Sequence, residues 1–149
     1  MTSWYFAYGS NLLIDQMVER IGLAVDGADS WRIARLTGYR LVFQCLENDQ
    51  PAYANIIRSG REVWGVVYRC SEAELLRLDE FEQGYRREVL EVTDRNGEIL
   101  VAAAYVMEQT GNGLRGRPAA DYLEKIITGS RRHRLPESYI GEIEAAAQE

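Results

Sequence analysis

Short runs of β-branched and aromatic residues, spread over most of the chain, limit the possible folds more than any other feature of the sequence. Such runs, bounded by turn residues, are typical of sheet strands. The last two flank Asn96-Gly97, the turn chemistry that a tight antiparallel hairpin needs. The sequence therefore predicts about six strands, at residues 3–8, 39–45, 53–57, 63–68, 85–93 and 99–107.

Helical patterns lie between these runs. Apolar residues recur every four positions from Leu13 to Ile21, which predicts a short helix with one apolar stripe. Ser71 followed by Glu74 forms a capping box, so a second helix is predicted to begin there and to end near Gly84. These helices interrupt the series of strands.

The C-terminal part is predicted to be helical over 119–128 and again from Pro136 to about residue 147. The order of elements predicts an α+β fold: a small mixed, barrel-like sheet of about six strands with interspersed and C-terminal helices. A chain of 149 residues with 46% hydrophobic residues matches one domain, spanning 1–149.

Charge and composition disfavour several classes of protein. A net charge of -6 would repel a phosphate backbone, so no nucleic-acid partner is expected. No apolar run approaches the roughly 20 residues of a membrane span, and residues 1–4 lack the start of a signal peptide, so we expect a cytoplasmic protein with no membrane contact. With one histidine and two distant cysteines, the chain has no zinc ligand set. No metal or cofactor is expected, although a site made of carboxylates alone is left open.

The first candidate site is the turn formed by Tyr8, Gly9, Ser10, Asn11 and Leu12. Glycine lets backbone N–H groups approach a ligand closely, and the start of a helix favours an anion. The same turn could simply connect a strand to a helix, so this pattern alone does not establish a site.

The second candidate is the acidic stretch at residues 78–82. Helical spacing places Glu82 on the apolar face that also carries Leu78, whereas Glu80 is rotated towards solvent. A carboxylate on such a face is unfavourable unless it is paired, hydrogen-bonded or protonated. Glu82 therefore either forms a structural ion pair with Arg86 or Arg87, or takes part in chemistry.

In this order, the two segments resemble the γ-glutamylcyclotransferases. In that family the first strand runs into a Tyr-Gly-Ser-Asn-Leu loop and the central helix ends in Leu-Asp-x-x-Glu, which residues 5–12 and 78–82 match. The resemblance continues through residues 62–68 and 84–87 and into 122–139, so it covers nearly the whole chain. One departure is Gln83, which stands where the family usually has a glycine, and it leaves the shape of the adjoining pocket wall open.

The resemblance implies conversion of a γ-glutamyl amino acid or γ-glutamyl amine to 5-oxoproline plus the free amino acid or amine. The α-amine of the substrate would attack its own γ-carbonyl, with Glu82 as general base and then general acid. The turn would hold the glutamyl part, with Tyr8 and Tyr122 as pocket walls, although packing of a helix explains Tyr122 equally well. Asp79 is expected to be a structural carboxylate.

Several alternatives stay open at this stage. The leaving group could be an amino acid, an amine such as a lysine isopeptide, or a secondary metabolite. Its pocket is expected near residues 108–118 and after Asn48. A non-catalytic small-molecule-binding or interaction module on the same fold is the competing class. His133, in an arginine-rich segment, is expected on the surface, and the oligomeric state is open.

Overall fold

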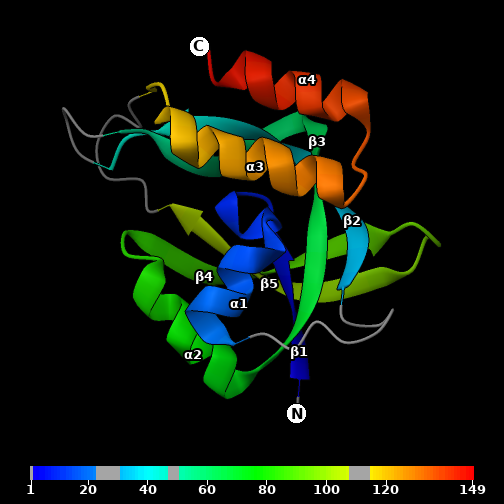
Figure 1. The fold of residues 1–149 in the computed structure, drawn as a ribbon. Coiled ribbons are helices and arrows are strands. Elements are labelled where there is room, and N and C mark those ends of the chain that lie inside the picture. The colour runs from blue at the N-terminus through cyan, green and yellow to red at the C-terminus, as the bar shows by residue number, and fades with distance from the viewer. Residues whose placement is uncertain (1, 23–30, 47–50, 108–114) are drawn as a thin grey trace.

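The computed structural model describes residues 2–22, 31–46, 51–107 and 115–149, and these form a barrel with helices around it (Figure 1). Within these ranges, five strands close into the barrel in the order β1-β3-β2-β4-β5. Neighbouring strands pair antiparallel, except that β5 returns to β1 through a short parallel pairing. The strands are β1 (Thr2–Ala7), β2 (Trp31–Gln44), β3 (Tyr53–Ser71), β4 (Tyr85–Asp94) and β5 (Ile99–Met107). The predicted α+β barrel is confirmed.

Two of the predicted strands are parts of one long strand. The runs at 53–57 and 63–68 both belong to β3, because β2 pairs with β3 on both sides of a register shift between Thr37 and Tyr39. Residues 58–62 lie in this ribbon with no buried side chain, so they lack the apolar residues that mark a strand in the sequence. Solvent exposure, and not a break in the strand, explains the interruption of the pattern.

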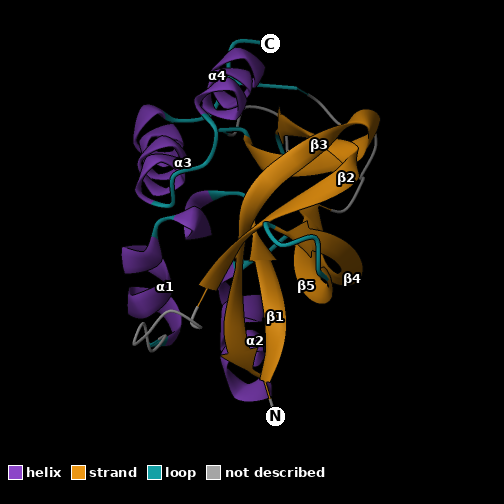
Figure 2. Cartoon of the chain, turned by 90° about the vertical axis from the view of Figure 1, so that its right-hand side faces the viewer, coloured by secondary structure: helices purple, strands orange, loops and turns teal. Residues whose placement is uncertain are grey.

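The helices described around the barrel are the short 3-10 turn η1 (Ser10–Leu12), α1 (Ile14–Ile21), α2 (Glu72–Phe81), α3 (Ala120–Arg132) and α4 (Glu137–Ala146). The predicted capping box begins α2: the Glu74 N–H donates to Ser71 Oγ at 3.1 Å, and the Ser71 N–H donates to the Glu74 carboxylate at 2.7 Å. Figure 2 shows α1 and α3 on the same side of the barrel, and η1 packs against α3. None of these described helices has the length and apolar character to cross a bilayer.

The connection between β1 and α1 is held from two sides. A Cβ built on Gly129 of α3 would lie 2.4 Å from the Leu12 carbonyl carbon and 2.6 Å from the Leu13 nitrogen, so only glycine allows this close approach. On the barrel side, the hydroxyl of the fully buried Tyr68 donates to the Asn11 carbonyl at 2.9 Å. The turn is therefore clamped between the barrel and α3.

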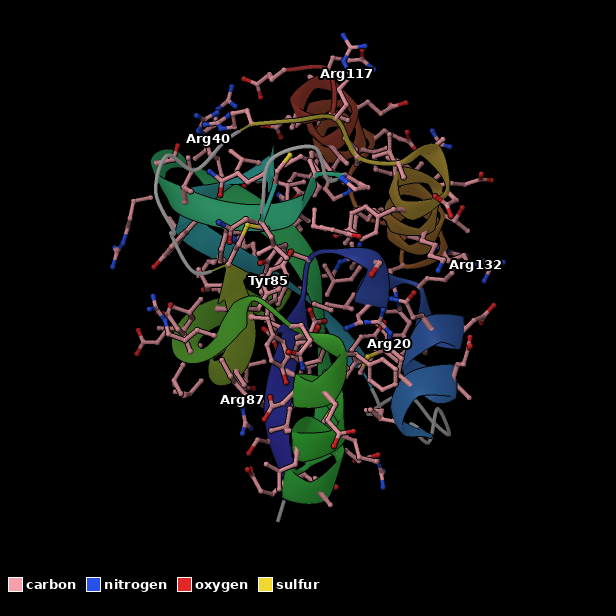
Figure 3. The ribbon with its side chains drawn as sticks, turned by 90° about the vertical axis from the view of Figure 1, so that its left-hand side faces the viewer. Arg20, Arg40, Tyr85, Arg87, Arg117 and Arg132 are labelled. Carbon is pink, nitrogen blue, oxygen red and sulfur yellow. The ribbon has the colours of Figure 1, made fainter. Side chains whose placement is uncertain are left out.

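His133 follows α3 and is buried, so its predicted surface position is wrong. Its Nε2 lies 3.2 Å from the Tyr68 hydroxyl, its ring packs edge-on against Trp31, and burial lowers the pKa of the imidazole. The side chains of Arg131 and Arg132 are 56% and 57% exposed, and Figure 3 shows Arg132 projecting from α3. The charged neighbours were a misleading signal, because adjacent residues of a helix face different directions.

Replacing Gly129 with alanine tests the close packing of α3 on the turn. We expect Gly129→Ala to lower the free energy of unfolding by about 1–3 kcal/mol, because backbone atoms of Leu12 and Leu13 would have to move. Gly141→Ala in α4 is the matched control, since a Cβ there meets nothing within 4 Å and alanine favours helix. Urea unfolding measures both, and equal stabilities of the two variants would contradict the clamp.

Candidate active site

The glycine turn follows β1 directly. The Leu12 N–H donates to the Gly9 carbonyl at 3.0 Å and the Leu13 N–H donates to the Ser10 carbonyl at 3.0 Å, which closes the short helical turn η1. The first N–H groups of such a turn have no acceptor within it. The turn therefore presents backbone donors next to the side chains of Ser10 and Asn11.

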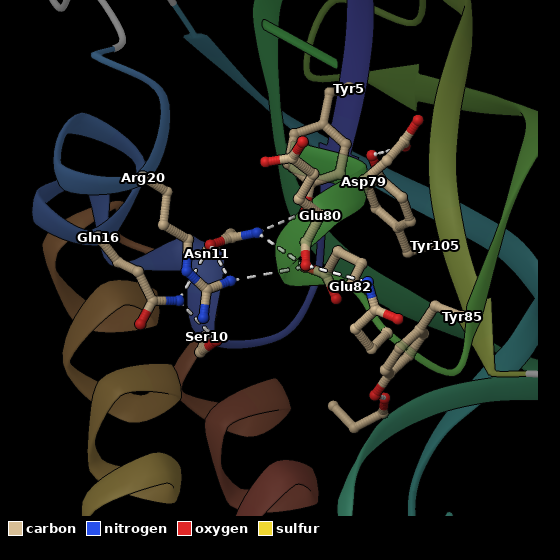
Figure 4. A network of polar contacts seen from close by, with 12 residues as sticks. Tyr5, Ser10, Asn11, Gln16, Arg20, Asp79, Glu80, Glu82, Tyr85 and Tyr105 are labelled. Carbon is tan, nitrogen blue, oxygen red and sulfur yellow. Dashed lines mark hydrogen bonds and ion pairs between the residues drawn. The ribbon is translucent and has the colours of Figure 1, made fainter. Parts of the chain in front are cut away.

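Glu82 lies at the C-terminal end of α2, where the helix stops. Its N–H donates to the Asp79 carbonyl at 3.2 Å, and its side chain is 16% exposed. Its Oε1 accepts from Asn11 Nδ2 at 3.2 Å and lies 3.7 Å from Arg20 Nη1 (Figure 4). The carboxylate thus points at the turn, from a residue 71 positions further along the chain.

Burial dominates the electrostatics of Glu82. It raises the pKa of the carboxyl from 4.5 to about 7, with a further contribution from Asp79, while Arg20 and the Asn11 amide oppose the shift. A glutamate that titrates near neutral pH can both accept and return a proton under physiological conditions. This is the property that a residue acting as base and then acid requires.

Asn11 is the centre of a buried polar network. Its Oδ1 accepts from Gln16 Nε2 at 2.9 Å and from Arg20 Nη1 at 3.3 Å. Its Nδ2 donates to the Tyr5 hydroxyl at 3.0 Å as well as to Glu82. Because the amide oxygen faces donors from α1, the amide nitrogen must face the carboxylate.

A cavity of about 400 Å³ lies between the turn, the end of α2, α1, α3 and the barrel. Leu12 is the predicted site residue outside the described lining: it is 1% exposed, and its N–H donates to the Gly9 carbonyl, so it lies in the core and closes the turn. The cavity brings together the other predicted residues, which are Tyr8, Gly9, Ser10, Asn11, Glu82 and Tyr122.

The arginine that pairs with Glu82 is not one of the two considered from the sequence. Arg87 lies 3.3 Å from Asp79, whereas Arg20 of α1 lies beside Glu82. Asp79 also accepts from the Tyr105 hydroxyl at 2.5 Å, which agrees with its expected structural role. Glu82 therefore has a cation nearby and still opens into the cavity.

Three further polar residues of the cavity were missed in the sequence. Gln16 and Arg20 stand four positions apart on α1, and Gln16 Oε1 accepts from Lys125 of α3 at 3.2 Å. The spacing of Gln16 and Arg20 on the helix after the turn was the available signal. No sequence pattern around Lys125 predicts its position in the cavity. Among the described residues, no group of three or more His, Cys, Asp or Glu side chains could hold a metal ion.

The glycine turn and the largely buried Glu82 carboxyl thus border one cavity. Residues 5–124 match the family described as gamma-glutamyl cyclotransferase, AIG2-like. The chain is 33% identical to the gamma-glutamylcyclotransferase of Mus musculus, over 97% of this chain and 78% of that protein. It is 31% identical to that of Homo sapiens, over 95% and 77%.

A solved structure called gamma-glutamyl cyclotransferase agrees with these matches. It superposes on this chain with a TM-score of 0.83 at 28% identity, covering 97% of this chain and 88% of that one. The chain belongs to the gamma-glutamyl cyclotransferase, AIG2-like family, and the resemblance seen in the sequence is confirmed. Since the similar proteins are named for an enzyme, the prediction of a γ-glutamylcyclotransferase-like enzyme is confirmed as well.

The raised pKa of Glu82 makes stability depend on pH. Between pH 4.5 and about 7 the Glu82 carboxyl is more fully protonated in the folded protein than in the unfolded chain. The contribution of Glu82 to stability therefore falls as the pH rises through that window. A pKa moved from 4.5 to about 7 corresponds to about 3 kcal/mol. We expect Glu82→Gln to gain up to about that amount relative to wild type on going from pH 4 to pH 8.

Urea unfolding at the two pH values measures this difference. Glu80→Gln is the matched control, because Glu80 stands two positions away in α2 and is exposed. A difference between wild type and Glu82→Gln that stays constant with pH would show that Glu82 titrates normally.

Proposed function

We propose that this protein cyclises a γ-glutamyl group to 5-oxoproline and releases the amino acid or amine that was attached to it. The observation that supports this most directly is the Glu82 carboxyl, which has a pKa of about 7 and faces the Gly9–Asn11 part of the turn across one cavity. Family membership supplies the reaction class, and the site offers the proton donor and acceptor that this class needs.

The reaction is an intramolecular acyl transfer. The α-amine of the substrate attacks its γ-carbonyl carbon, a ring C–N bond forms, and the C–N bond to the leaving amine breaks. No protein nucleophile takes part, so the protein must mainly hold the glutamyl chain in a folded conformation. Such orientation is worth roughly 7–11 kcal/mol in well-aligned intramolecular reactions.

Glu82 moves the proton. An α-ammonium group has a pKa of about 8, and an unperturbed glutamate carboxyl has a pKa of about 4.3. Transfer of a proton from the first to the second is therefore strongly uphill, at ~1.4 kcal/mol per pKa unit. With the pKa of Glu82 at about 7, the transfer is nearly balanced. Glu82 then gives this proton to the departing nitrogen, takes up the second proton that the ring nitrogen loses, and passes that proton to the released amine. Arg20 and Asn11 oppose the effect of burial, which keeps a fraction of Glu82 ionised at neutral pH.

The turn holds the glutamyl part. Backbone N–H groups of Gly9, Ser10 and Asn11 bind substrate oxygens, either the α-carboxylate or the oxyanion that forms at the γ-carbon. Leu12 contributes through the backbone that it closes with Gly9. Tyr8 and Tyr122 form walls, and no metal is needed because the proton transfer and the orientation supply the catalysis.

Release of 5-oxoproline tests the proposal. Purified protein with EDTA is incubated with several γ-glutamyl amino acids and amines, and 5-oxoproline is measured by mass spectrometry. We expect turnover by wild type and by Glu80→Gln, and a loss of about 10²–10⁴-fold in kcat for Glu82→Gln, as for removal of a general acid–base group.

Each departure from this result has a distinct meaning. Wild-type activity in Glu82→Gln would remove Glu82 from the mechanism. Activity that appears only when EDTA is omitted would contradict the metal-free reaction. Binding of γ-glutamyl compounds without any 5-oxoproline would favour a non-catalytic binding module.

A further inference from the structure

The cavity has two chemically different sides. Gln16, Arg20 and Lys125 from α1 and α3 lie on the side of the Ser10 hydroxyl, which accepts from Gln16 at 2.7 Å. The other side lies next to Gly9 of the turn, where a Cβ would be 3.5 Å from Ala54 and from the Tyr122 hydroxyl, and its lining residues are Leu46, Tyr53, Ala54, Tyr85 and Tyr122. Figure 4 shows Glu82 between Arg20 and Gln16 on one side and Tyr85 on the other. Among the described lining residues, this second side carries no charged group.

Two of the tyrosines on this side direct their hydroxyl groups at the backbone of one residue. The Tyr85 hydroxyl donates to the Ala54 carbonyl at 2.6 Å, and the Ala54 N–H donates to the Tyr122 hydroxyl at 3.0 Å. Because these polar atoms are directed at Ala54, the two residues offer the cavity mainly their rings. The hydrogen bonds also fix the rings on β4 and α3 against β3.

Tyr53 completes the aromatic side. Its ring meets that of Tyr122 edge to face, with centroids 5.1 Å apart and planes at 85°. Such a pair is a favoured arrangement of aromatic rings, and it gives a rigid apolar surface beside Ala54. We call Tyr53, Tyr85 and Tyr122 the aromatic wall.

We propose that the aromatic wall selects substrates whose leaving amine or amino acid carries an aromatic or bulky apolar side chain. This inference rests on the proposed function: the turn and the polar side hold the glutamyl part, and the scissile amide lies at Glu82. The leaving group then extends from Glu82 away from Ser10 and Asn11, against the wall, which meets the turn at Gly9. A charged side chain packed against these rings would lose its hydration without an ion partner among the described residues, whereas the α-carboxylate is common to all leaving amino acids and does not distinguish them.

Three substrates that differ only in the side chain of the leaving amino acid test the inference. They are γ-glutamylphenylalanine, γ-glutamylalanine, and γ-glutamyllysine in which the γ-glutamyl group is joined to the α-amine of lysine. We expect kcat/KM for the phenylalanine compound to exceed that for the alanine compound by at least about tenfold, and the lysine compound to be the poorest of the three. Tyr53→Ala should bring the phenylalanine-to-alanine ratio close to one, and Tyr53→Phe should keep it. Leu76→Ala, at an exposed position of α2, is the surface control and should keep the ratio.

Binding to Glu82→Gln, measured by calorimetry, separates recognition from turnover. The phenylalanine compound should bind at least about tenfold more tightly than the alanine compound, and this gap should close when Tyr53→Ala is added. Turnover of all three substrates at similar rates, or a preference for lysine, would overturn the aromatic preference and leave the proposed function standing. No 5-oxoproline from any substrate would reject the proposed function, and equal binding of the two compounds would reject the aromatic wall.

Discussion

The hydrogen bond between Asn11 and Glu82 joins the two parts of the site, the glycine turn and the end of α2, and the barrel and helices hold both parts in place. A carboxylate that is 16% exposed is unfavourable unless neighbouring donors compensate for its lost hydration. Here one amide donor and one guanidinium compensate only in part, so the pKa of Glu82 stays near 7. Weaker compensation would keep the acid protonated, and stronger compensation would make it a poor base.

The barrel and the helices hold the two partners of this hydrogen bond in place. β1 pairs with β3 over its length and delivers the turn, while Tyr68 of β3 holds the turn from the inside. The capping box at Ser71 begins α2 directly after β3, and α2 ends at Glu82. Because β3 both contacts the turn and leads into α2, one strand sets the distance between the glycine turn and the glutamate.

Much of this could be predicted from local patterns. The α+β barrel follows from the apolar runs and the Asn96-Gly97 hairpin. The helical period predicted Glu82 on the apolar face of α2, whereas in the structure Glu82 follows the last helical residue, Phe81, and its carboxylate points at the turn. The joining of two runs into β3 was missed, because an exposed stretch of a paired strand carries no apolar alternation. The buried position of His133 was missed for the opposite reason, since its charged neighbours face solvent. Lys125 reaches the cavity through the packing of α3 on the turn, which no local pattern encodes, whereas the four-residue spacing of Gln16 and Arg20 on α1 was an available signal.

The most direct test of this account is the titration of the Glu82 carboxyl itself. Carbon-13 NMR of glutamate-labelled protein follows each side-chain carboxyl with pH, and Glu82→Gln assigns the signal. The account expects a midpoint near pH 7 in the free protein, moving higher when Arg20 is replaced by methionine. A midpoint at the ordinary glutamate value of 4.5 would contradict it, because the carboxyl would then be too weak a base for the α-ammonium group.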